Sequence, residues 1–188
     1  HDAKEYTSIP KSKQDQEYLI NSLTQQLNTN PIDWNCVRVI LILMYAGMEP
    51  DPRIPVLGEQ LFKMPRPMKM SDDQGWAYRS MLQLLLLQPS VEAAQLVAAA
   101  VDREFWGDDP FHTTALVRDD TEMSILNMRL YALKGLRLKM PPEISIPVLQ
   151  EITDRYLATD MSQEDRGFVF NINKTATWIE NKKNQNNK

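Results

Sequence analysis

The chain contains two stretches that are almost alike, RIPVLGEQLF at residues 53–62 and SIPVLQEITD at residues 145–154. Both read Ile-Pro-Val-Leu-X-Glu, so apolar and polar residues follow each other in the same order. A proline is tolerated in the first turn of a helix, because the N–H that it lacks would have no partner there. We therefore predict that both prolines lie near a helix start. We also predict that the Val and Leu after each Pro point into a core, with Leu57 and Leu149 at equivalent buried positions.

The rest of the chain has the spacing of helices and lacks the signals of strands. Alternation with period two and the hairpin dipeptides Asn-Gly and Asp-Gly are missing, and the chain has only 6 glycines. Polar residues that can cap a helix precede the apolar runs, and prolines separate these runs. The expected caps are Ser12, Asn30, Ser71, Asp119 and Ser162. The sequence thus predicts an all-α fold with helices at residues 13–28, 31–47, 53–63, 72–87, 90–105, 121–138, 142–157 and 163–181.

The predicted helices are of two alternating types. Helices 31–47, 72–87, 121–138 and 163–181 open after a polar cap and carry long apolar stripes. The other type, at 53–63, 90–105 and 142–157, follows the first three of them. Once the long linker before the third pair is set aside, the period is about 40 residues, which is typical of two-helix repeats.

This spacing resembles that of HEAT and armadillo repeats. The resemblance implies antiparallel helix pairs that stack into a solenoid and share one continuous core. An irregular helical bundle is the alternative. We expect one domain at residues 13–181, with a polar arm at residues 1–12 and a disordered tail at residues 182–188.

Composition excludes some classes of function. The chain has 188 residues, a net charge of -4 and a pI of about 5.3, which argues against nucleic acid as the main partner. No apolar run approaches the ~20 residues of a membrane span. The chain starts at His1 with polar residues, and a removed signal peptide would fit this start, so we expect a periplasmic or secreted protein; the cytoplasm is the alternative. The lone Cys36 lies in an apolar run and is expected to be a buried small hydrophobe.

Two clusters could carry chemistry. In DREFWGDDPFH, carboxylates and one imidazole could bind a divalent metal or share acid–base work, although a solvated loop explains them as well. In FKMPRPMKM, the thioethers of Met64, Met68 and Met70 could bind Cu(I), but methionine more often fills gaps in a core. Motifs for phosphate binding, for zinc and for a nucleophilic serine are missing. The sequence predicts neither a catalytic set nor a cofactor.

The linker from Trp106 to Asp120 is the strongest candidate for a binding site. Helix-to-helix links usually have about 2–8 residues, and this one has about 14. Aromatic side chains anchor interfaces, and acids around them steer a basic partner. Alternatively, Trp106 and Phe111 pack back onto the helices and fix the linker. The predicted contact residues are Trp106, Asp108, Asp109, Phe111, His112, Asp119 and Asp120.

The function that these features favour is a non-enzymatic protein-binding module. Its expected form is an inhibitor or immunity-type protein that caps a partner enzyme, with a basic enzyme as the partner. One alternative is a copper carrier, or a hydrolase that uses the cluster from Asp108 to His112. A scaffold or adaptor is another. The sequence makes no prediction of the oligomeric state.

Overall fold

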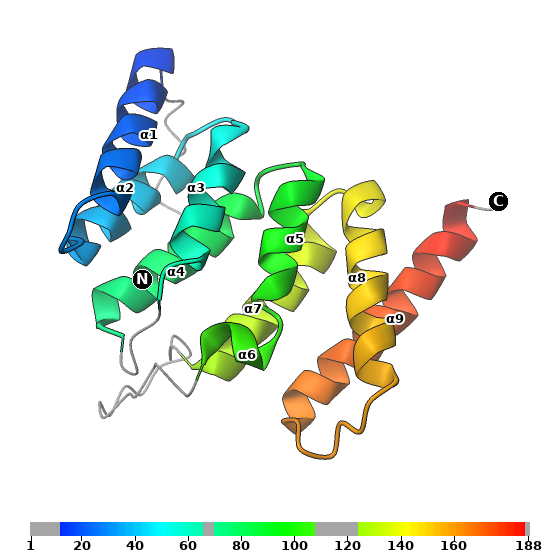
Figure 1. Ribbon diagram of the computed structural model, residues 1–188. Coiled ribbons are helices and arrows are strands. Elements are labelled where there is room, and N and C mark those ends of the chain that lie inside the picture. Colours follow the sequence, from blue (N-terminus) through cyan, green and yellow to red (C-terminus); the bar gives the residue numbers. More distant parts are fainter. Residues whose placement is uncertain (1–11, 66–69, 108–123, 187–188) are drawn as a thin grey trace, which may run out of the picture.

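The computed structural model describes residues 12–65, 70–107 and 124–186, and every regular element in these ranges is a helix (Figure 1). The helices are α1 (Lys13–Leu27), α2 (Trp34–Tyr45), α3 (Arg53–Phe62), α4 (Asp72–Leu85), α5 (Val91–Ala99), α6 (Arg103–Trp106), α7 (Ile125–Lys139), α8 (Pro142–Leu157) and α9 (Arg166–Asn186). The predicted all-α class is confirmed. In the described part of the chain, no helix combines the length and apolarity needed to cross a membrane.

The helices pack in two rows. In the front row of Figure 1, α1 contacts α3, α3 contacts α5, and α5 contacts α8; in the back row, α2 packs on α4 and α7 on α9. Consecutive elements connect the rows through the contacts α1–α2, α3–α4, α4–α5, α5–α7, α7–α8 and α8–α9. The helices therefore follow one another from α1 at one end of the body to α9 at the other (Figure 1).

The core fills the space between the rows. Most side chains of α4 belong to this core. Tyr78, Met81, Leu82 and Leu85 of this helix are fully buried. The Tyr78 hydroxyl is also satisfied, because it donates a hydrogen bond to the Leu61 carbonyl oxygen in α3 at 3.1 Å. A helix that is buried on most of its surface is stabilised mainly by packing.

Of the five predicted caps, two are confirmed, Asn30 and Ser162 are wrong, and Asp119 lies outside the described residues. The Ser12 hydroxyl accepts from the Asp15 N–H at 3.1 Å, and the Ser71 hydroxyl accepts from the Gln74 N–H at 3.2 Å. Helix α2 was expected to start at residue 31, after Asn30. It starts at Trp34, because the Asp33 carboxylate accepts from the N–H of Cys36 at 3.0 Å and caps the helix there.

Other helix ends also differ from the predictions. The helix expected at 90–105 ends at Ala99 and is followed by the short α6. The helix expected at 121–138 starts at Ile125, capped by Ser124. The helix expected at 163–181 starts at Arg166 and runs on to Asn186, so the prediction of a disordered tail from residue 182 is wrong as far as Asn186.

A hydrogen bond to α8 holds the extended C-terminal part of α9. Lys183 Nζ donates to Gln150 Oε1 in α8 at 2.7 Å. Lysines in the last turn are also favoured by the negative end of the helix dipole.

The two related stretches both lie in the front row, in α3 and α8. Leu57 and Leu149 are both buried, as predicted. Pro147 lies inside α8 and not near its start, because this helix begins at Pro142. Val56 is 63% exposed, so the prediction that both valines face the core holds only for Val148. Cys36 is only partly buried and packs against the edge of the core.

A polar network ties the C-terminal helices to the turn between α5 and α6, at Val101 and Asp102. The buried Arg129 of α7 donates to the Val101 carbonyl oxygen at 2.7 Å, to Glu164 at 2.8 Å and to the Tyr156 hydroxyl at 3.1 Å. Tyr156 in turn donates to Asp102 at 2.9 Å. Burial, with help from this hydrogen bond, raises the pKa of Tyr156 to about 12.

Candidate protein-binding groove

Trp106, the first of the predicted contact residues, lies in the core. Its side chain is fully buried, and Nε1 donates to the Ala100 carbonyl oxygen at 3.0 Å. Its ring meets those of Phe105 and Tyr78 edge to face, at centroid distances of 4.8 and 6.1 Å. The expectation of Trp106 as an exposed anchor is therefore wrong, and this residue packs back onto the helices, as the alternative expected.

The remaining predicted contact residues lie outside the described residues, so their role stays a prediction; they are Asp108, Asp109, Phe111, His112, Asp119 and Asp120. Two acids of the neighbouring cluster can be placed, the exposed Glu104 of α6 and Asp102. Asp102 accepts hydrogen bonds from Tyr156 at 2.9 Å and from Arg155 at 2.7 Å. Its carboxylate thus holds helices together, and the pKa of Arg155 is raised chiefly by its hydrogen bond to Asp102.

The part of the chain that the structure describes contains no group of three or more His, Cys, Asp or Glu residues able to hold a metal ion. Among the methionines of FKMPRPMKM, Met70 is buried and Met64 packs against the core, whereas Met68 lies outside the described residues. The two thioethers that can be placed therefore fill space between helices.

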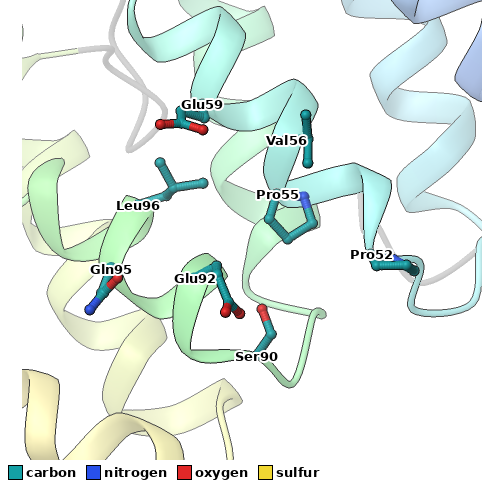
Figure 2. A pocket seen from close by; sticks show the side chains of 8 residues that line it. All are labelled: Pro52, Pro55, Val56, Glu59, Ser90, Glu92, Gln95 and Leu96. Atoms are coloured by element: carbon teal, nitrogen blue, oxygen red, sulfur yellow. The ribbon is translucent and has the colours of Figure 1, made fainter.

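A groove lies between α3 and α5 in the front row (Figure 2). Its volume is about 500 Å³. Helix α3 supplies Pro55, Val56 and Glu59, and α5 supplies Glu92, Gln95 and Leu96; Pro52 and Ser90, which cap the two helices, complete the lining. The floor is thus largely apolar, which is typical of sites that bind another molecule.

The starts of the two helices shape this groove. Pro52 precedes α3 and Pro55 lies in its first turn, so this edge presents few backbone N–H groups. The Ser90 hydroxyl accepts from the Ala93 N–H at 3.1 Å and fixes the start of α5. The exposed Val56 projects from α3 beside the groove, which leaves an apolar side chain in contact with solvent.

Two carboxylates lie at opposite ends of the apolar lining, Glu59 on α3 and Glu92 on α5 (Figure 2). Glu59 forms an exposed ion pair with Lys63 at 2.6 Å. The carboxylate of Glu92 forms no ion pair or hydrogen bond with another residue in the described ranges. An exposed ion pair contributes little to stability, so a cation from a partner could replace Lys63 at small cost.

A second hollow, of about 410 Å³, adjoins the first between α5 and α8. Gln95 borders both hollows. The second one has Ala98, Val148 and Ile152 among its apolar residues and Glu151 at its rim. Together the two hollows form an acidic and partly apolar surface across three helices of the front row.

No known protein family, curated protein or solved structure matches this chain. The function must therefore be argued from the chain's own geometry.

The sequence predictions missed the residues of this groove. The prolines around α3 were recognised only as helix breakers and starters, and α5 carries no distinctive motif. A signal was present in Val56 and Glu59, since an apolar residue three positions before an acid on one helix face can form half of such a site. Nothing in the sequence showed that α5 would supply the other half.

Proposed function

We propose that the chain is a non-enzymatic protein-binding module, built as a HEAT-like stack of helix pairs, that binds a basic and partly apolar segment of a partner protein in the α3–α5 groove. The observation that carries this proposal is the apolar floor between Glu59 and Glu92. Cations on the partner segment would pair with these carboxylates, while its apolar side chains would cover Pro55, Val56 and Leu96. A basic enzyme, inhibited when one of its segments is held in this way, is one form of such a partner.

The order of helix contacts supports the HEAT-like arrangement. Front-row helices contact each other in succession, and each is joined to the back row by neighbours in the chain. A solenoid of this kind offers an extended surface for a protein segment, not a deep polar pocket for a reaction.

Titration calorimetry with short synthetic peptides tests the proposal. Peptides in which Lys and Arg alternate with Leu and Ile should bind, and the same peptides with Glu in place of the basic residues should bind more weakly at this groove. Glu92→Gln should weaken binding about fivefold, the effect of one rim charge, and Val56→Ser should weaken it by a similar factor. Both side chains are exposed, so neither variant should unfold the protein.

Glu180→Gln is the matched control, because it removes an exposed carboxylate from α9, far from the groove. Binding that is equally weakened in this control would show that only net charge matters. Basic peptides that bind wild type and Glu92→Gln with the same affinity would contradict the proposed site.

A further inference from the structure

Charge is distributed unequally between the two rows. The front row displays Glu59, Glu92, Glu151 and Asp154 on its exposed surface. In the back row, α7 carries four basic residues and no acid, and α9 has a single acid, Glu180, among its basic residues. The exposed cations of these two helices include Lys134, Lys139, Arg166, Lys174 and Lys183. A chain with a net charge of -4 therefore has a basic surface on one side.

Arg79 of α4 is a cation of this row that lies close to two aromatic rings. Its guanidinium carbon lies 5.4 Å from the ring centre of Trp76 and 5.1 Å from that of Tyr131 in α7. Two aromatic rings hold a guanidinium by cation–π attraction and restrict its motion. The donors of Arg79 form no ion pair or hydrogen bond with other residues in the described ranges. The charge is thus positioned but not neutralised.

Acidic residues near Arg79 do not neutralise its charge. Helix α4 has Asp72 and Asp73 in its first turn, two turns before Arg79. Asp73 is already paired with Arg38 of α2 at 3.1 Å. A guanidinium fixed in this way keeps its fork of N–H donors available for a carboxylate from outside the chain.

Tyr131 brings a second cation to the same place. Lys139 Nζ donates to the Tyr131 hydroxyl at 3.2 Å and lies 5.4 Å from its ring centre. An exposed apolar residue of the same helix accompanies these cations, because Leu138 lies two turns from Tyr131 on the same face of α7. Aromatic, arginine and apolar side chains together are the composition of protein interfaces.

We infer that Trp76, Arg79, Tyr131 and Lys139 form a second docking site, which binds an acidic and partly apolar segment of a partner protein through a carboxylate on the Arg79 fork. The site has the opposite charge preference to the α3–α5 groove and does not depend on it. A carboxylate is a better candidate for this place than a nucleic acid backbone, because the whole chain carries a net charge of -4.

Short synthetic peptides rich in Glu, Leu and Phe test this inference, with binding measured by fluorescence anisotropy. Arg79→Gln should weaken binding about tenfold or more, as expected for the loss of a charge-assisted hydrogen bond to a carboxylate. Arg79→Lys should weaken it as well, because an ammonium group lacks the planar fork. Lys63→Gln, which removes an exposed cation from the end of α3 in the front row, should leave the affinity unchanged.

Lys139→Gln is the second variant, since this exposed side chain can be changed even if Arg79→Gln lowers the melting temperature. It should weaken binding about threefold, in keeping with a single exposed charge.

Acidic peptides that fail to bind wild type, or that bind it and both Arg79 variants equally, would overturn the inference. Binding of inorganic phosphate or duplex DNA that depends on Arg79, without peptide binding, would overturn it in favour of a phosphate ligand. If the chain self-associates in sedimentation experiments and Arg79→Gln abolishes this association, the occupant is instead a second copy of the chain.

Discussion

Residues 54–57 of α3 and residues 146–149 of α8 are the same four amino acids, but the two helices bury different sides of them. In α3, Ile54 is fully buried and Val56 is 63% exposed. In α8, the isoleucine is half-buried, Pro147 is exposed, and Val148 is only 9% exposed. The leucine alone is buried in both helices.

The buried stripes explain this difference. In α3 the stripe consists of residues 54, 55, 57, 58, 61 and 62, and in α8 it consists of residues 145, 148, 149, 152 and 153. Both stripes have the spacing of one helix face, but they are offset by one residue relative to the shared letters, which corresponds to a rotation of about 100°. Leu57 therefore matches Val148 in position, and Leu149 matches Gly58. The predicted equivalence of Leu57 and Leu149 is correct for burial and wrong for register.

The helix starts and the facing side chains set this offset. Helix α3 starts two residues before its proline, at Arg53, whereas α8 starts at Pro142, so the same proline falls in the second turn. The neighbours differ too: a Cβ at Gly58 would lie 3.1 Å from Leu85 of α4, so a leucine at that position of α3 has no room. A short shared sequence thus fixes that a helix forms, but its neighbours decide which face is buried.

The largest effect in this comparison is expected at the leucines. Leu149→Ala and Leu57→Ala should each lower the free energy of unfolding by about 2–5 kcal/mol, because both remove a buried side chain and leave a cavity. Urea denaturation measures the loss. A midpoint close to wild type for Leu149→Ala would mean that α8 buries another face and would remove the basis of the offset.

The prolines should give effects of opposite sign. Pro147→Ala should raise the free energy of unfolding by about 1–3 kcal/mol, since alanine restores a helix N–H and an exposed proline ring contributes little packing. Pro55→Ala should lower it slightly, because this proline needs no N–H partner in the first turn and its ring is buried. Thermal unfolding of both variants tests the pair, and a loss of stability in Pro147→Ala would show that α8 does not continue regularly through this residue.

The valines should show the smallest effects and the sharpest contrast. Val148→Ala should cost about 1–2 kcal/mol, whereas Val56→Ala should stay within about 0.5 kcal/mol of wild type, since only the first removes buried apolar surface. Chemical denaturation of both variants provides the comparison. Equal losses would indicate that the two stretches are in register after all.

The sequence was a good guide to the helices and a poor one to the surfaces between them. Caps such as Ser12 and Ser71 act on backbone N–H groups a few residues away, so local sequence was sufficient to place them. Trp106 was misjudged, because its ring packs on Tyr78 of α4 and on its neighbour Phe105, and both of these rings pack on Phe62 of α3.

The two candidate sites were missed for the same reason. The α3–α5 groove needs Glu59 and Glu92 on two helices, and the Arg79 site needs Tyr131 from a helix far along the chain. The charge, apolarity and spacing of the residues in one helix do not show how a neighbouring helix is rotated about its own axis. Such sites become visible only once the rows are assembled.

The hydrogen bonds of Arg129 have a consequence for the order in which the protein opens. Its partners come from the end of α5, from α8 and from the turn before α9. If α9 detached alone, a buried guanidinium would lose Glu164 while still enclosed by the other helices, and breaking such a pair costs about 3–5 kcal/mol. The C-terminal helices should therefore open as one cooperative unit, although stacked repeats in general can fray from their ends. Native-state hydrogen exchange should then give α7, α8 and the first turns of α9 the same opening free energy, and that shared value should be lost in Arg129→Met.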